Sequence, residues 1–562
     1  MISRRALLKI AGQSGLAAGC APFASSLISM NNLSRTSAVR CINVVNFIRG
    51  VEPRFETDLL LPVRKQMELI LAHKLPATWL LQYDALVSGP FVEFLKAHKA
   101  PDHEVGIWFE MNEMHCKAAD VEWRGRPGYE WDHYPAVAFT IGYTPLERVK
   151  LADTFMRTFK SVFGDYPRSV ASWNLDGFTM DHLTENYKVD AYAVCRDQIA
   201  TDGFTIWGAP IAGYYPSRTN CWSPAIIDAN QIETPVFRML GQDPVYYYEK
   251  EFSLPSGKRI GEPDTMEPVW TSGRSPRFIE SFLSMISDAP TGQFAYAQLG
   301  QENSFPWPEM EPGYAPQMEA LTKLRKAGKV HIETMGESGR RFKHAFPTTP
   351  VQAQVQMTDP FGNASPTEST VWYQSRYYRA NLHFRGDLPF LRDLTVYHDR
   401  FLQPFLHKPT RLHEVEQRMP SLLDGYHWSK EHGPDKEPGA GCFFEAGGKR
   451  LRLTGKPSIQ ENGKALIADL PVQDGKVLTI RFEEDRIQSR LTPGADKLIA
   501  SFEWDPTKAS LVEVHPQQAK YRWQEFDYSL GIHAGTAQAT DTGFVVAGVK
   551  GLVEFRLSQA LG

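Results

Sequence analysis

Residues 102–115 read DHEVGIWFEMNEMH, and this stretch decides the fold. An apolar run that ends at Phe109 leads directly into a polar cluster containing Glu110, Glu113 and His115. Sheets built from strand–helix units hold their chemistry at the carboxyl ends of the strands. The stretch therefore predicts a buried strand whose carboxyl end opens into a functional site. The alternative is an ordinary strand followed by a polar loop.

The alternation of apolar strands and amphipathic helices continues on both sides of this stretch. Short connections indicate parallel strands joined by right-handed crossovers, and about seven or eight such units close a barrel. Between residues 208 and 273 the periodicity fades into aromatic and polar loops. The predicted strands cover residues 41–47, 77–82, 104–109, 169–173, 189–194, 204–207, 292–299 and 330–333. One helix is predicted to begin near Pro62. Other predicted helices cover residues 91–98, 145–163, 178–186, 278–286 and 314–327.

The pattern changes near residues 347–350. Beyond this point apolar residues alternate with a period of two, and turn signals such as Asn462-Gly463 separate the apolar stretches. The sequence therefore predicts an α/β chain with a distorted (β/α)7–8 barrel followed by an antiparallel β-sandwich. The expected domains are a leader and linker at 1–38, the barrel at 39–348 and an accessory sandwich at 349–562.

Composition excludes several classes of protein. The chain has 562 residues, 42% of them hydrophobic, and a formal net charge of −4. It can bury a large core, and without a long basic run nucleic acid is not an expected partner. Its six cysteines include no CxxC pair, so a zinc knuckle is not expected either.

The first residues indicate targeting, not fold. Arg4 and Arg5 lie in a segment that resembles a twin-arginine export signal. The run from Leu16 to Cys20 resembles a lipoprotein processing site, although Ala17 stands where such sites usually carry a larger aliphatic residue. We expect export to the periplasm or outer surface, with membrane contact only through a lipid on Cys20. Past this leader, no apolar run is long enough to span a bilayer.

Three motifs resemble the glycoside hydrolase/deacetylase superfamily. Residues 103–110 are similar to its HE-[IV]-G-x-W-x-E strand, residues 163–176 to its next helix–strand unit, and residues 300–335 to its closing unit. The resemblance implies a distorted barrel that acts on polysaccharides, often with a β-domain behind it. Within the superfamily, the chain is most similar to an uncharacterised bacterial family with a barrel followed by a β-rich domain.

The first predicted strand departs from the metal-dependent deacetylases of this superfamily. Those enzymes pair an aspartate dyad with a His-x-x-x-His set, whereas this strand ends in Asn46 and Arg49 and has no Asp-Asp. His103 and His115 are twelve positions apart, too far for one helical turn. No cofactor is therefore predicted. As an alternative, Glu110, His115 or Asp243 from separate strand ends could still hold a divalent metal.

A pair of carboxylates at strand ends remains, and glycoside hydrolysis needs such a pair. Glu110 lies beside Trp108 and Phe109 and is predicted to keep its proton, while Asp176 is predicted to stay ionised. The two roles could be reversed, and Glu302 or Asp197 could substitute. The predicted catalytic residues are Glu110, Asp176 and Glu302. The predicted substrate-binding residues are Arg49, Glu52, Arg54, Trp108, Glu113, His115, Trp173, Asn174, Asp197, Arg218, Asn220, Asp243 and Asn303.

Each of these residues also has a purely structural interpretation. Glu110 could pair with Arg49 or Arg54, Asp176 could cap a helix, and Arg218 could pin a loop. Three functions remain open. The first is a secreted glycosidase on a poly- or oligosaccharide, with room for an acidic sugar. The others are a metal-dependent polysaccharide deacetylase and a non-catalytic surface protein that binds carbohydrate.

Overall fold

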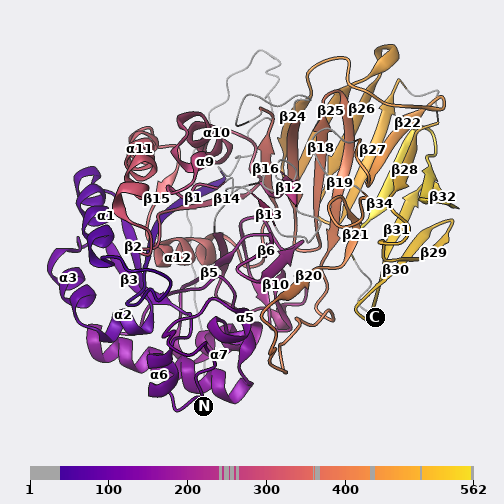
Figure 1. Ribbon diagram of the computed structural model, residues 1–562. Helices are drawn as coiled ribbons and strands as arrows, with labels where there is room; N and C mark the ends of the chain where they lie inside the picture. Colours follow the sequence, from indigo (N-terminus) through magenta and orange to yellow (C-terminus); the bar gives the residue numbers. More distant parts are fainter. Residues whose placement is uncertain are drawn as a thin grey trace, which may run out of the picture. The chain divides into compact units, whose positions relative to one another are not determined.

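The computed structural model describes residues 38–239, 243–245, 252–253, 259–260, 265–358, 360, 368–430, 437–493 and 497–558 (Figure 1). The predicted leader, with Arg4, Arg5 and Cys20, lies outside the described residues. Among the helices of the described part, none combines the length and the apolar character that crossing a membrane requires.

A curled parallel sheet forms the first half of the fold. Its pairing order is β14-β1-β2-β3-β4-β5-β11-β8, with β15 also pairing β1, and only β8 runs antiparallel to its neighbour. Within the described residues the strand pairing does not close into a ring, so we call the sheet a half-barrel. It corresponds to the distorted barrel predicted from the sequence. The strands are β1 (Val39–Ile48), β2 (Ala77–Leu81), β3 (His103–Trp108), β4 (Ser169–Ala171), β5 (Ala191–Cys195), β8 (Gly213–Tyr214), β11 (Val236–Met239), β14 (Phe294–Leu299) and β15 (His331–Ile332).

Helices cover the outside of these strands (Figure 1). The helix over residues 145–163 starts where capping chemistry places it, because Thr144 closes a capping box with Glu147. One helix begins at Trp307, seven residues earlier than predicted, because Pro312 in its second turn is typical of a helix breaker. The helices that correspond to predicted ones are α1 (Leu60–His73), α3 (Pro90–His98), α6 (Pro145–Phe163), α7 (Gly177–Tyr187), α10 (Pro276–Ser287) and α11 (Trp307–Lys326).

Two predicted assignments need correction. Residues 204–207 form β7 (Phe204–Trp207), but this strand pairs β6 (Gln198–Thr201) and β20 (Val415–Arg418) outside the half-barrel. Its expected place beside β5 is taken by β11, a short strand in the segment where periodicity fades. The helix α12 (Met335–Ala345) was not predicted, because Gly336 and Gly339 interrupt its helical pattern.

The interior of the half-barrel is a packed core. Alternate residues of β1, including Val45 and Phe47, share one buried cluster with Trp108 of β3. Met335 of α12 and Trp372 of β17 (Glu368–Gln374) belong to the same cluster. The interior is therefore filled by side chains from the sheet, from α12 and from the antiparallel region.

Glutamines of the antiparallel region bind the half-barrel. They alternate along β16 (Gln352–Gln356), so their side chains share one face of the strand. Gln352 accepts a 3.2 Å bond from the Gly213 amide of β8 and also donates to its carbonyl. Gln354 accepts from Arg196 at 2.7 Å, and Gln356 donates to a serine of α10 at 2.5 Å. We call these three residues the glutamine row.

The remaining strands are antiparallel, as predicted. Two sheets, ordered β16-β17-β18-β19-β22-β28-β33-β32 and β24-β25-β26-β27-β34-β31-β30-β29, contribute to one shared core. Residues 38–562 form one compact unit, which neither places nor excludes a domain boundary within it. The expected boundary between barrel and sandwich at 348/349 therefore stays a prediction. The strands not yet given are β18 (Tyr378–Arg385), β19 (Leu388–Val396), β22 (Gly441–Ala446), β24 (Ser458–Asn462), β25 (Ala465–Pro471), β26 (Val477–Phe482), β27 (Arg486–Thr492), β28 (Ile499–Glu503), β29 (Leu511–His515), β30 (Gln518–Trp523), β31 (Phe526–Ala534), β32 (Thr536–Thr540), β33 (Gly543–Ala547) and β34 (Leu552–Arg556).

Candidate active site

Three charged residues meet at the carboxyl edge of the half-barrel. Arg49 follows β1, Glu110 follows β3 and Glu302 follows β14. The guanidinium of Arg49 lies between the carboxylates: Nη2 is 3.1 Å from Glu110 Oε2, and Nη1 bonds both Glu302 and Ser304. Arg49 is 2% exposed, Glu110 0% and Glu302 8%. We call these residues the Glu110–Arg49–Glu302 cluster.

Asn303 fastens the two strand ends that carry Arg49 and Glu302. Its side-chain oxygen accepts a 2.9 Å bond from the Arg49 amide, and its Nδ2 donates to the Arg49 carbonyl at 3.0 Å. The same nitrogen also donates to the carbonyl of Leu59 at 2.9 Å. Asn303, predicted to bind substrate, therefore bonds the backbone on which the cluster is built.

Trp131 covers the cluster. Its indole nitrogen donates to Glu110 Oε2 at 3.1 Å, and its ring lies 4.2 Å from the Arg49 guanidinium and 5.0 Å from that of Arg54. Trp131 belongs to residues 117–143, the irregular segment that follows the strand β3. The sequence indicates that a segment at a strand's carboxyl end covers the site, but nothing in it singles out Trp131 among several aromatic residues.

Burial changes the acidity of the cluster. It raises the pKa of Glu302 to about 7, although Arg49 and Arg54 oppose this shift. Burial alone lowers the pKa of Arg49, but Glu110 and Glu302 more than offset it, and the net pKa is raised. Nearby Glu267 is also buried, which raises the pKa of its carboxyl. At neutral pH the site therefore contains a carboxyl, Glu302, that is poised between its two protonation states.

A small cavity lies next to the cluster. Its volume is about 20 Å³, and Phe47, Trp173, Glu267, Gln298 and Gln301 are among its lining residues. Such a volume accommodates about one water molecule. A sugar ring does not fit into this cavity.

Two buried polar side chains at the same edge lack partners within the described residues. Both polar atoms of Gln82 and the indole nitrogen of Trp108 make no hydrogen bond there. Thr78 and Leu80 of β2 point into the half-barrel, so Gln82, two positions further on, points the same way. Buried polar groups normally find a partner, and these two are available to a ligand or to water. Gln82 was missed in the sequence, where it lies in an apolar strand.

The two predicted tryptophans lie beneath the cluster. Trp108 stacks on Phe47 with a ring separation of 3.8 Å, and Trp173 meets Trp108 edge-on at 5.0 Å. Both form an aromatic layer between the interior core and the charged residues. The side-chain amide of Asn174, which is buried three residues after β4, has no hydrogen-bond partner among the described residues.

Asp176 is not brought to the cluster. Its carboxylate caps α7 through the Thr179 amide at 3.0 Å and pairs with Arg148 at 2.9 Å. Asp176 and Arg148 are 0% and 1% exposed. These contacts agree with the interpretation of Asp176 as a helix cap. The carboxylate that lies near Glu110 is that of Glu302, not that of Asp176.

His115 and Glu113 also lie outside the cluster. The His115 ring stacks on Tyr83 at 4.6 Å, and its Nε2 lies 2.9 Å from the carbonyl of Leu151. Burial lowers the pKa of His115 to about 4, so it is a neutral core histidine at pH 7. Glu113 is exposed in the first turn of the short helix α4 (Glu113–Ala118).

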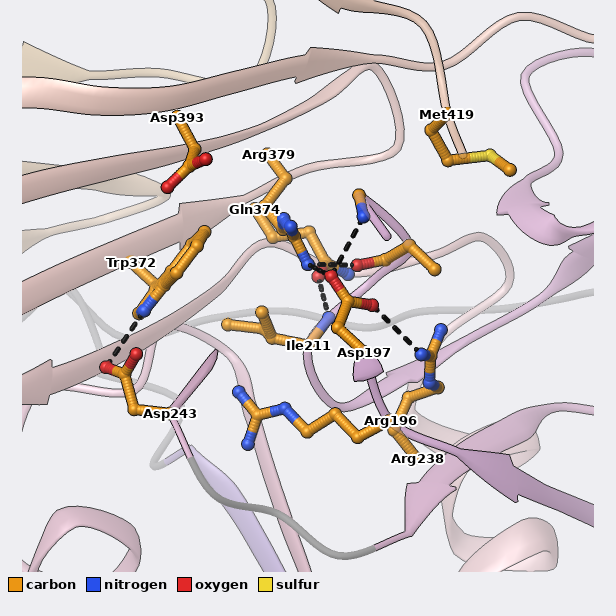
Figure 2. Close-up of polar contacts among 12 residues, drawn as sticks. Arg196, Asp197, Ile211, Arg238, Asp243, Trp372, Gln374, Arg379, Asp393 and Met419 are labelled. Carbon is orange, nitrogen blue, oxygen red and sulfur yellow. Dashed lines mark hydrogen bonds and ion pairs between the residues drawn. The ribbon is translucent and has the colours of Figure 1, made fainter. Parts of the chain in front are cut away.

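Asp197 and Asp243 lie where the half-barrel meets the antiparallel region. Figure 2 shows Asp197 between Arg238 and Arg379, with ion-pair distances of 3.1 and 2.7 Å. Asp243 accepts a 2.9 Å bond from the indole of Trp372. Both aspartates therefore contact β17 or β18 and serve the contact between the two regions.

The other predicted binding residues pair within the protein. Arg54 forms a bidentate pair with Glu52 beside Trp131, with Nε 2.7 Å from Oε1. Arg218 binds Asp181 and Glu185 of α7. Asn220, at the start of β10 (Asn220–Pro224), lies 3.4 Å from the carbonyl of Phe401. Glu52 and Arg54 lie beside Trp131, whereas Arg218 and Asn220 hold loops in place.

The side chains present do not fit the metal centre that the resemblance to deacetylases suggests. Glu110, His115 and Asp243 lie in three separate environments, and His103 bonds Trp79 and the Leu75 carbonyl near the start of β3. Among the described residues, no three His, Cys, Asp or Glu side chains are grouped so that they could hold a metal ion.

Comparisons with known proteins give likenesses of fold. No family model matches the sequence, and no curated protein matches it. A structure from Parabacteroides distasonis, named as a glycoside hydrolase/deacetylase, is 14% identical with a TM-score of 0.49, covering 68% of this chain and 91% of its own. Structures named as polysaccharide deacetylases from Mycobacterium smegmatis and Pseudomonas aeruginosa are 13% and 11% identical, with TM-scores of 0.34 and 0.32. They cover 56% and 55% of this chain, and 96% and 92% of their own.

Proposed function

We propose that the chain is a hydrolase that acts on carbohydrate, with the Glu110–Arg49–Glu302 cluster as its reaction centre. The observation that carries this proposal is the burial of two carboxyl groups around one guanidinium, at the edge where such folds hold their chemistry. A carboxyl group with a raised pKa in such a place, like that of Glu302, is typical of a catalytic acid or base.

The finer proposal is cleavage of a glycosidic bond. This reaction needs one carboxyl that donates a proton to the leaving oxygen and one that attacks the anomeric carbon or activates water. The raised pKa of Glu302 suits the proton donor. Glu110, which accepts hydrogen bonds from Arg49 and Trp131, is then the second carboxylate.

Deacylation of a polysaccharide is the second candidate. A buried guanidinium beside a carboxylate can stabilise the oxyanion that forms when water attacks an acyl group, and Arg49 is placed in this way. Glu110 would activate the water, and Glu302 would protonate the leaving alcohol. The solved structures named above as polysaccharide deacetylases give the same reaction as the one to test.

One experiment separates these reactions. The purified protein is incubated with bacterial and plant polysaccharides, and reducing sugar and acetate are both measured. Sugar release that is lost in Glu110→Gln and Glu302→Gln supports the glycosidase, and acetate release lost in the same variants supports the deacylase. Glu93→Gln, which changes an exposed carboxylate of the helix α3, is the matched control and should keep full activity.

Binding without turnover by any variant would contradict both reactions and support a carbohydrate-binding protein. Acetate release that survives both Gln variants but stops with a chelator would move the reaction to a metal site outside the cluster.

We also propose export by the twin-arginine route, which rests on Arg4 and Arg5 alone. Replacing both with lysine should retain the protein in the cytoplasm of the producing cell, as measured by fractionation. Retained membrane association after Cys20→Ala would contradict a lipid anchor on that residue.

A further inference from the structure

Arg148 of α6 joins three segments that are distant in sequence. Its Nε donates to the carbonyls of Thr140 and Tyr143 at 2.9 and 2.7 Å. Its Nη1 and Nη2 donate to the carbonyls of Leu406 and Phe405 at 2.8 and 2.7 Å. The remaining partner is the Asp176 carboxylate, which neutralises its charge. One buried side chain thus binds the segment that carries Trp131 to a loop of the antiparallel region.

More contacts join the same two segments. The Thr410 amide donates to the Ile141 carbonyl at 2.9 Å, and Arg411 Nη1 donates to the Gly142 carbonyl at 2.6 Å. The His413 ring stacks on Tyr134 at 4.0 Å and is within 12° of parallel to it. We call residues 403–414, between β19 and β20, the clasp, and residues 117–143 the insertion.

The insertion in turn lies over the reaction centre. Its backbone is bonded to the end of β3, because the Met111 amide donates to Ala138 at 2.9 Å and the Glu113 amide donates to Glu130 at 2.8 Å. Trp131 lies between these anchor points and bonds Glu110. With Trp131 in place, Glu110 and Arg49 are buried and the adjacent cavity holds only about one water. Trp131, which contacts both Glu110 and Arg49, therefore covers two members of the cluster.

We infer that the clasp positions the insertion, and with it Trp131, over the Glu110–Arg49–Glu302 cluster, so that the antiparallel region sets access to the reaction centre. This inference rests on the proposed function only in taking the cluster as the reaction centre. Arg411 and His413 are then positioning residues that touch the insertion through exposed side chains. Their loss releases the insertion without removing a group from the cluster.

The test uses the full chain and the double variant Arg411→Ala/His413→Ala. The matched control is His407→Ala/Lys408→Ala, which removes one imidazole and one cation from the same clasp at exposed positions. Hydrogen exchange is measured by mass spectrometry over the insertion and over strands β24 to β27. We expect exchange in the insertion to be about tenfold faster in the double variant and unchanged in the control and in the strands.

Kinetics supply a readout that a loss of folding would not give. Once the insertion opens, water reaches Glu302, and we expect the alkaline limb of the pH–rate profile to move to lower pH while kcat falls about tenfold. Unchanged exchange in the insertion, or an equal increase throughout the chain, would overturn the inference.

The two proposals fail in different ways. Faster exchange confined to the insertion, without hydrolysis of any polysaccharide by the wild type, would keep the clasp and overturn the proposed function. Hydrolysis that depends on Glu110 and Glu302, with exchange unaffected, would do the reverse.

Discussion

Glu110 and Glu302 are chemically the same side chain and differ only in their surroundings. Glu110 accepts from both Arg49 and Trp131, whereas Glu302 bonds Arg49 beside the buried Glu267. Sequence spacing predicts both as strand-end acids. Sequence spacing cannot show which of the two carboxyls keeps its proton, because their hydrogen-bond and ion-pair partners come from segments far away in the chain.

The raised pKa of Glu302 predicts the pH dependence of activity. A reaction that needs its proton should lose kcat/KM as the pH rises through about 7, and Glu302→Gln should lower kcat by about 10²–10⁴-fold. The folded chain binds this proton more tightly than the unfolded chain. Through this group, the free energy of unfolding therefore falls as pH rises from 4.5 to about 7. A pH–rate profile with no change near pH 7 would argue against Glu302 as the acid.

Asp176→Asn tests the alternative catalytic assignment. Because the carboxylate neutralises buried Arg148 and caps α7, we expect the free energy of unfolding to fall by about 3 kcal/mol, measured in urea. Asp181→Asn, a half-exposed pair partner in the same helix, is the control and should cost less than about 1 kcal/mol. If Asp176→Asn lost activity without losing stability, Asp176 would be a catalytic residue.

At the scale of elements, periodicity and capping predict β1 to β5 and, within a few residues, the helices α1, α3, α6, α7 and α10. The sequence places β7 in the barrel and does not predict β11. Strands of four residues look alike in sequence, and only their pairing shows which of the two belongs to the half-barrel. The candidate site is likewise only partly predictable from the sequence. Strand ends locate Glu110, Glu302 and Arg49, while Trp131 and Gln82 depend on how an irregular segment and a buried strand end are placed.

The glutamine row leads to a prediction about β16. Gln352→Leu leaves the amide and carbonyl of Gly213 without a partner in a buried place, and we expect a loss of about 2 kcal/mol in the free energy of unfolding. Gln460→Leu, on the exposed strand β24, is the control and should change stability by less than about 0.5 kcal/mol. Equal effects of the two substitutions would mean that the buried bonds of Gln352 contribute nothing.

On the scale of the whole molecule, the half-barrel is completed by residues that follow it in sequence. Trp372 fills part of its interior, and Asp197 pairs with Arg379 of β18 across the contact (Figure 2). Residues 38–348 alone should therefore expose apolar surface. We expect this fragment to bind a hydrophobic dye and to lose the cooperative thermal unfolding of the full chain. Cooperative unfolding of the fragment would show that the predicted domain boundary separates independent folding units.

The glutamine row has a consequence for how such chains diverge. Two regions joined by a flexible linker can be exchanged between genes, because neither depends on the other's side chains. Here a foreign β-region would have to offer amides at three alternating positions of its first strand, together with an indole where Trp372 stands. We therefore expect the two halves to be inherited as one unit, and recombination within the coding sequence to be tolerated at their surface loops but not at the contact between them.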